Sequence, residues 1–413
     1  MVEENTRSVF QNATALMIMQ IASYLLPLIL IPYLTRVLGV TLYGITAFGL
    51  AIVQIAAILT DYGFVNSATY KIAREQGDKL AVRKIISSVM ACKILLVLIV
   101  TVLLGIFILT QDKYQQYESF LWLLLLPILG QTFQPLWFFQ GIERMALITI
   151  YTVSARILYL VLAILLVNSP KDYAWVAVAN GAGQVVAAVI GIAMMIRMGY
   201  TPVRVEFSQV RQVFKESTQF FWSRAAVSTY TAGGAFFLGL TSTPLQVAYY
   251  SAAEQLYRGA QALMQPIAQA LFPYMAKNKD FTLFFKILKL MVVLALVGAL
   301  VGSLLGEWII NIIFGPEFYG GYPVLVVLIA TLVLTVPSVL LGYPFLGALG
   351  AVRHANLSVI IAGCIQMILL FCLYFGGFKS AVSVALTVFS VEFFVLSYRG
   401  YYARKLWIGW RHQ

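Results

Sequence analysis

Long apolar runs separated by short polar segments occupy most of the chain. Because about 20 helical residues cross the ~30 Å hydrocarbon layer of a bilayer, hydropathy predicts twelve membrane-spanning helices. They cover about residues 12–34, 43–64, 87–110, 120–140, 146–167, 173–196, 217–240, 247–275, 285–305, 322–343, 355–375 and 379–398. The pattern therefore predicts an all-α polytopic membrane protein.

The predicted linkers suggest how the spans are grouped. A long polar linker at 197–216 divides them six and six. We expect an N-terminal lobe at 1–196, a C-terminal lobe at 217–398 and a basic cytoplasmic tail at 399–413, lying along the membrane surface. Two parallel six-helix lobes predict a central cavity, with a binding site between them.

The span at 247–275 combines an apolar character with a polar face. Glu254, Arg258, Gln261 and Gln265 follow one another at steps of four, three and four. At ~100° per residue they fall within about 60° of one another. A charged side chain at the centre of a span costs ~3 kcal/mol. This face must therefore contact other helices or water, and we interpret it as one wall of the cavity.

Composition and charge placement support the membrane assignment. Hydrophobic residues make up 61% of the chain and charged residues 11%, which is outside the range of soluble domains. One set of loops, with both tails, holds 20 of the 28 Lys and Arg residues, and the opposite loops hold four. By the positive-inside rule both termini lie in the cytoplasm. We therefore attribute the net charge of +12 to membrane topology and to contact with anionic lipids. No nucleic-acid partner is expected.

Four basic residues remain inside the predicted spans: Lys93, Arg156, Arg224 and Arg258. Arg156 lies ~15 Å deep at helical rise, whereas Lys93 is shallow enough to snorkel to the cytoplasm. Uncompensated guanidinium groups would favour an anion, and phosphate suits their planar donor fork. The alternative is structural pairing of these arginines with carboxylates or helix carbonyls.

Three acidic residues also lie within the spans and are candidates for ion coupling. Asp61, near an inner span end, is expected to be solvated. Glu254 precedes Arg258 by four residues, so an intrahelical ion pair explains it equally well. Glu392 could snorkel or titrate.

The residues that enzymatic chemistry would need are sparse. The chain has no Walker A pattern, and its three cysteines sit in apolar runs without metal-ligand spacing. No predicted outer loop exceeds roughly 20 residues, which leaves little room for an extracytoplasmic active site. We expect no metal, no cofactor and no enzymatic activity.

Several stretches resemble the Wzx-type flippases of lipid-linked O-antigen units, within the multidrug/oligosaccharidyl-lipid/polysaccharide exporter superfamily. They are IPYLTRVLGVTLYG (31–44), DYGF (61–64), FFQGIERM (138–145), YYSAAEQLYRGAQALMQPIAQALFP (249–273) and FGPEFYGG (314–321). The resemblance covers spans one to ten in matching order. The last two spans carry no matching motif.

The resemblance implies a V-shaped, twelve-helix transporter of the bacterial inner membrane. It would move undecaprenyl-diphosphate-linked oligosaccharide from the inner to the outer leaflet by alternating access through a cationic cavity. Membrane lipid and other O-antigen assembly proteins are the expected partners. Arg36 and Arg258 fall inside matching motifs. With Arg156, Arg224 and Lys93 they would attract the diphosphate, while Gln261, Gln265, Gln184 and Asn180 would bind the glycan.

Two other functions are compatible with a polytopic chain. A cation-coupled drug exporter of the same superfamily predicts an acidic or apolar cavity, which the excess of deep arginine disfavours. A membrane glycan polymerase predicts large outer loops, which the sequence lacks.

Overall fold

The chain folds into helices joined by short turns. The computed structural model describes the backbone of residues 2–411 and the side chains of residues 19, 22, 23, 25–222, 224–226 and 233–409. Within this part of the chain, nine helical segments are long and apolar enough to cross a membrane, and the first of them, Leu25–Arg74, has 50 residues. The prediction of an all-α polytopic membrane protein is confirmed.

Contacts divide the chain into two compact units. Unit 1 comprises Met1–Leu38 and Gly49–Ala225, and unit 2 comprises Gly39–Phe48 and Ala226–Gln413. The helices that begin in unit 1 are α1 (Val2–Asp61), α2 (Phe64–Arg74), α3 (Lys79–Thr110), η1 (Asp112–Tyr117), α4 (Glu118–Leu123), α5 (Leu125–Phe133), α6 (Leu136–Gly141), α7 (Met145–Leu166), η2 (Pro170–Ala174), α8 (Trp175–Arg197) and α9 (Phe207–Thr241). Within this unit, α8 packs against α5 and α7.

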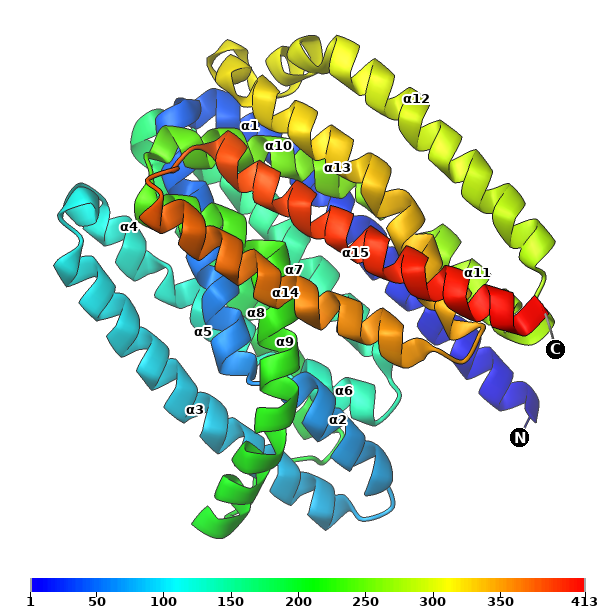
Figure 1. Ribbon diagram of the computed structural model, residues 1–413. Helices are drawn as coiled ribbons and strands as arrows, with labels where there is room; N and C mark the ends of the chain where they lie inside the picture. Colours follow the sequence, from blue (N-terminus) through cyan, green and yellow to red (C-terminus); the bar gives the residue numbers. More distant parts are fainter. Residues whose placement is uncertain (1, 412–413) are drawn as a thin grey trace. The chain divides into compact units, whose positions relative to one another are not determined.

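The remaining helices belong to unit 2. They are α10 (Pro244–Ala262), α11 (Gln265–Asn278), α12 (Phe281–Phe314), η3 (Pro316–Gly321), α13 (Tyr322–Leu340), η4 (Leu341–Gly347), α14 (Val352–Phe375) and α15 (Ala381–Arg411). Helix α15 lies between α13 and α14 and contacts both (Figure 1).

These units differ from the predicted lobes in three places. Helix α9 begins at Phe207, inside the expected linker, and the boundary falls within it after Ala225. Gly39–Phe48 belongs to unit 2. The expected tail continues α15 as far as Arg411. Its Trp407 packs on Phe281, with ring centroids 4.4 Å apart, so aromatic contact fixes this segment to the helical body.

The bend in α1 at Gly39 explains why Gly39–Phe48 joins unit 2. Gly39 has φ 71°, a left-handed conformation that breaks the helix and that glycine adopts without strain. Immediately after the bend, the Val40 N–H donates to Glu317 Oε2 at 2.9 Å. A carboxylate at a helix N-terminus satisfies a backbone donor that has no intrahelical acceptor. Two of the family-like motifs thus form one structural junction.

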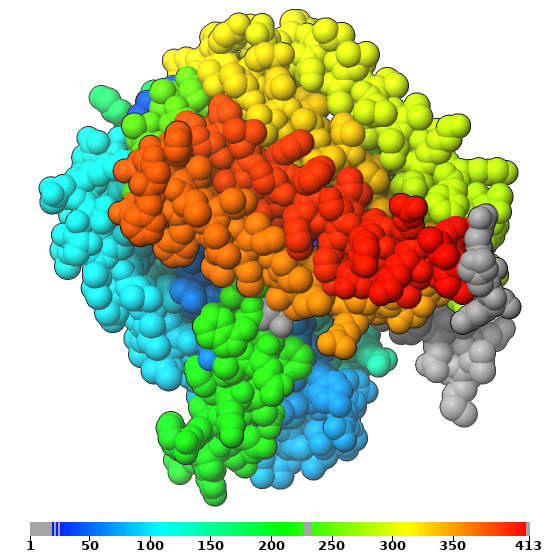
Figure 2. Space-filling model, viewed as in Figure 1, coloured from blue at the N-terminus to red at the C-terminus, as the bar shows by residue number. Residues whose placement is uncertain are grey.

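Each unit has its own apolar core. In unit 1, the FFQGIERM motif contributes Phe138 and Phe139, which are fully buried with Trp137 and Tyr151. In unit 2, Phe284, Phe345 and Leu346 form the corresponding cluster. Helices α3 and α12 instead present long rows of exposed Leu, Ile and Val side chains, and both form broad outer surfaces in Figure 2. Such apolar surfaces suit contact with acyl chains.

A buried arginine connects three helical segments of unit 2. Arg399 on α15 is 9% exposed and donates to Ser358 Oγ at 2.9 Å, Ser338 O at 2.8 Å and Ala355 O at 3.4 Å. Lysine cannot reproduce this planar fork. We expect Arg399→Lys to cost about 1–3 kcal/mol of stability, because buried acceptors lose their donors.

Thermal unfolding in detergent measures this effect. The matched control is Arg404→Lys on the exposed part of the same helix, which should leave the midpoint unchanged. Equal unfolding midpoints for the two variants would show that the hydrogen bonds of the Arg399 guanidinium contribute nothing to stability.

Candidate functional site

A connected row of polar side chains runs along α10 in unit 2. Arg258 Nη2 donates to Glu254 Oε1 at 3.1 Å, and the Tyr250 hydroxyl donates to the same oxygen at 3.4 Å. Gln261 Nε2 donates to the Tyr257 hydroxyl at 2.7 Å. The Arg258 side chain is 34% exposed and that of Glu254 17%. The predicted polar face of this segment is therefore accessible and internally hydrogen-bonded.

The helix carrying this row is interrupted just beyond it. Helix α10 ends at Ala262 and α11 begins at Gln265, with Pro266 in its first turn. The N–H groups of Leu263 and Met264 bond three residues back, to Ala260 and Gln261. Proline is tolerated at a helix start, where its missing N–H has no partner in any case. Gln265 therefore begins a second helix instead of extending the face of α10.

A charged cluster lies in unit 1, where α1, α3 and α9 contribute side chains. Arg224 Nε is 3.2 Å from Asp61 Oδ2, and the two side chains are 42% and 13% exposed. Lys93 is 3% exposed and donates to Thr132 O at 2.6 Å. Its ammonium group interacts electrostatically with both Asp61 and Arg224. The Thr132 hydroxyl donates to Thr60 Oγ1 at 3.0 Å, which links the cluster to α5.

These contacts change three expectations. Asp61 is not a solvated helix end, because it is mostly buried and paired with Arg224. Lys93 does not snorkel to the surface, because its ammonium group is bound to a buried carbonyl. Arg224 and Arg258 are not uncompensated, since each has a carboxylate partner. An anionic ligand would have to compete with Asp61 or Glu254 for these guanidinium groups.

The other predicted binding residues of unit 1 lie on α1, α7 and α8. Gln184 on α8 accepts from Gln134 Nε2 at 2.7 Å. Asn180 on the same helix hydrogen-bonds Tyr159 on α7. Arg156 on α7 is half-buried, and Arg36 on α1 is exposed. Their roles in binding remain predictions.

Glu392 is a buried carboxylate of unit 2. It is 5% exposed on α15, seven residues before Arg399, whose charge acts on it. It does not reach the surface as a snorkelling residue would. Within the described part of the chain, no set of three His, Cys, Asp or Glu side chains is placed to hold a metal ion.

Tyr250, Tyr257 and Thr335 are polar-site residues that sequence reasoning missed. Tyr250 and Tyr257 lie four residues before and three after Glu254, so helical spacing alone places them on its face. Thr335 on α13 contacts the Tyr257 hydroxyl at 3.0 Å. No local pattern identifies that residue, because it belongs to another helix.

Solved transporter structures share this fold. A lipid II flippase MurJ structure in an inward closed conformation aligns with a TM-score of 0.75 and 12% identity, covering 95% of this chain and 87% of that one. An inward-facing multidrug resistance MATE family transporter of the MOP superfamily aligns with a TM-score of 0.65 and 14% identity, covering 91% and 97%. This chain therefore shares the fold of these two solved structures.

Sequence comparison identifies the family. Residues 9–279 match the model of the polysaccharide biosynthesis protein family, and the chain belongs to that family. A "Putative O-antigen transporter" of Escherichia coli (strain K12) is 30% identical over 270 residues, which cover 65% of this chain and 65% of that protein. A protein of the same name from Shigella dysenteriae is 29% identical over 272 residues, covering 66% and 68%. The family resemblance predicted from the motifs is confirmed.

Proposed function

We propose that this protein is a flippase for lipid-linked oligosaccharide, carrying undecaprenyl-diphosphate-linked O-antigen units from the inner to the outer leaflet of a bacterial inner membrane. The observation that carries the proposal is the family match over residues 9–279. That region contains the Asp61, Lys93 and Arg224 cluster and the complete polar row of α10. Both termini would lie in the cytoplasm, as the distribution of basic residues predicts.

The chemistry of the two polar groups suits such a cargo. Arg224 and Arg258 are partly exposed, and a guanidinium binds phosphate through two parallel N–H donors. A diphosphate carries more negative charge than one carboxylate, so it can replace Asp61 or Glu254 as a partner. At an effective dielectric of ~20, a close charge pair contributes up to ~4 kcal/mol. Gln261 and Tyr257 offer amide and hydroxyl groups to the sugars.

The mechanism requires no covalent step. The phosphate and sugar groups would exchange water for these side chains while the polyprenyl chain stays in the lipid, and the site would open first to one leaflet and then to the other. The ion pairs would re-form when the cargo leaves, which avoids a bare charge in the membrane. Asp61, Glu254 and Glu392 are the candidate groups for coupling this cycle to an ion gradient.

A leaflet-specific assay tests this function. Purified protein is reconstituted into vesicles with a labelled polyprenyl-diphosphate oligosaccharide, and an added glycosidase reports the label in the accessible leaflet. We expect protein-dependent movement of label, and no comparable movement of a labelled phosphatidylcholine. Absence of lipid-linked sugar movement, with export of a cationic dye instead, would favour the drug-exporter alternative.

A further inference from the structure

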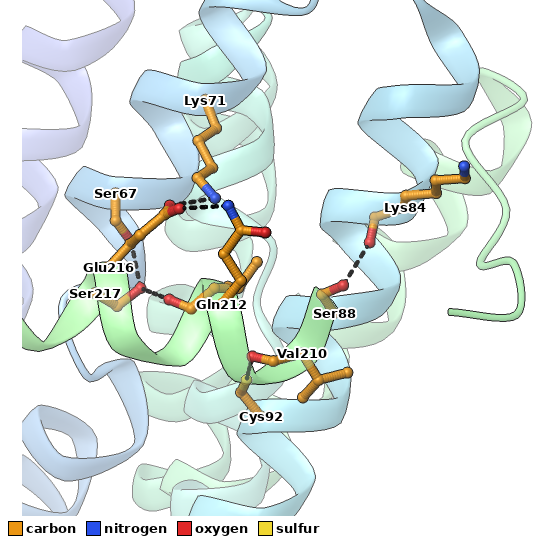
Figure 3. Close-up of polar contacts among 10 residues, drawn as sticks. Ser67, Lys71, Lys84, Ser88, Cys92, Val210, Gln212, Glu216 and Ser217 are labelled. Carbon is orange, nitrogen blue, oxygen red and sulfur yellow. Dashed lines mark hydrogen bonds and ion pairs between the residues drawn. The ribbon is translucent and has the colours of Figure 1, made fainter. Parts of the chain in front are cut away.

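Unit 1 contains a cavity whose lining includes neither Asp61 nor Arg224. Its volume is about 680 Å³, and its walls come from α2, the first turns of α3 and the first half of α9. The lining includes Lys71, Arg74 and Glu75 from the α2 end, Lys84 from α3, and Glu216 from α9. Figure 3 shows Lys71 and Glu216 meeting across α2 and α9, with Lys84 on the neighbouring helix.

The wall between α2 and α9 is held together by its own contacts. Lys71 forms an ion pair with Glu216, and Gln212 Nε2 donates to the same carboxylate at 2.9 Å. The Ser67 and Ser217 hydroxyls lie 2.7 Å apart in the same wall (Figure 3). Burial alone would raise the pKa of Glu216, but the hydrogen bonds from Lys71 and Gln212 and the charge of Lys71 hold that pKa below its ordinary value. The charges of Lys71 and Glu216 therefore offset each other within this wall.

The remaining charges leave the cavity with one net positive charge. Arg74 and Lys84 are exposed cations, and Glu75 is the exposed anion beside them. Arg74 donates to the Tyr70 hydroxyl at 3.3 Å, which holds its guanidinium beside an aromatic ring of the lining. A single phosphodiester, with one negative charge, balances this set. A polyprenyl diphosphate, with more charge, would exceed it.

The cavity also has an apolar edge. Phe220 is 38% exposed and Ile85 is half-buried, and both line it. Phe220 lies where α9 enters its predicted span, so the charged end of the cavity is at head-group level and the apolar edge faces the acyl region. The charged end lies on the side that the basic loops predict to be cytoplasmic.

We infer that this cavity binds the head group of a phospholipid with one negative charge, such as phosphatidylglycerol. Arg74 and Lys84 contact the phosphodiester, Gln212 and Gln219 supply amide groups for the glycerol hydroxyls, and Phe220 contacts an acyl chain. The lining of the cavity contains none of the cargo-binding groups proposed above. Occupation of it would fix α2 and α9 to the inner leaflet.

Native mass spectrometry of the full-length protein tests the inference. The purified protein is offered equal amounts of phosphatidylglycerol and phosphatidylethanolamine, and we expect retention of the former. Arg74→Gln with Lys84→Gln keeps the Lys71 and Glu216 pair, and should weaken that retention about tenfold or more, since each basic group near a membrane surface contributes about fivefold. Glu75→Gln should instead tighten retention about fivefold. Misfolding of the Glu75→Gln variant could not explain a gain in phosphatidylglycerol retention.

The matched control removes two cations of the same unit that do not line the cavity. Arg211 and Lys215 are exposed on α9, and Arg211→Gln with Lys215→Gln should keep phosphatidylglycerol retention near that of the original protein. Equal weakening by the control would show diffuse surface attraction and overturn the site. Equal retention of the two lipids would do the same. Displacement by millimolar glycerol phosphate or inorganic phosphate would overturn the lipid assignment in favour of a free phosphate.

Discussion

Replacing Arg224 and Arg258 together with alanine is expected to reduce lipid-linked sugar movement by about 100-fold or more while the protein still inserts. Each guanidinium offers a phosphate contact that contributes up to ~4 kcal/mol at an effective dielectric of ~20, and the loss of about a third of that per site gives this factor. The measurement is the leaflet-specific vesicle assay, with surface O-antigen in cells as a second readout. Single replacements should each lose roughly tenfold.

The carboxylate partners provide the control for this prediction. Glu254→Gln and Asp61→Asn remove the groups that compete with an anionic cargo and leave both arginines in place. If the arginines bind the cargo, these variants keep apparent cargo affinity or raise it, whereas the alanine variants lose it. If the pairs only stabilise the fold, breaking a pair from either side lowers thermal stability and transport alike.

Two results would contradict the proposed role of the arginines. One is normal transport by the double alanine variant at normal expression. The other is equal loss of transport and of thermal stability in Glu254→Gln and Arg258→Ala. In either case the family assignment would stand, because it depends on the sequence match and not on these side chains.

Features set by local spacing could be predicted from the sequence. The polar face of α10 follows from helical periodicity, and its Glu254 and Arg258 pair is a four-residue contact. The helical class follows from apolar runs of bilayer length. In both cases the residues that interact are close in sequence, so the helical repeat of ~3.6 residues is sufficient to predict the feature.

Features set by contacts between distant segments could not be predicted. Nothing near Asp61 in the sequence identifies Arg224 as its partner, and hydropathy alone suggested a solvated span end. The distance of Lys93 from a span end predicts that it snorkels, whereas in the structure its ammonium group donates to a carbonyl on α5. Depth along a helix does not determine which neighbouring helix supplies a partner.

The motifs mark structural junctions as well as functional groups. Gly39 and Glu317 lie in two separate motifs, and the contact between Val40 and Glu317 joins them. In DYGF, Tyr62 stacks on Phe214 and Phe221 of α9 at 4.3 and 4.6 Å. A boundary drawn from linker polarity misses such contacts, which is why the predicted lobe boundary at 197–216 differs from the one after Ala225.

A close backbone contact between two helices of unit 2 gives the second large prediction. Gly44, in the GVTLYG motif, lies against the start of α10, and a Cβ built on it would be 1.9 Å from the Pro244 carbonyl oxygen and 2.7 Å from the carbon. These are backbone atoms, so no side-chain rotation relieves the clash. Gly44→Ala should therefore cost about 3 kcal/mol or more, the upper end for overpacking.

The same substitution at Gly298 isolates this effect from the change in helix propensity. Gly298 lies inside α12 with nothing within 4 Å of a built Cβ, so Gly298→Ala should stabilise by about 0.5–1 kcal/mol. In thermal unfolding, we expect Gly44→Ala to lower the midpoint by at least about 5 °C and Gly298→Ala to raise it slightly. A lower unfolding midpoint for Gly44→Ala and a higher one for Gly298→Ala would show that the α1 segment after Gly39 is packed into unit 2. An unchanged midpoint for Gly44→Ala would mean that this segment does not dock against α10 in the membrane-inserted protein.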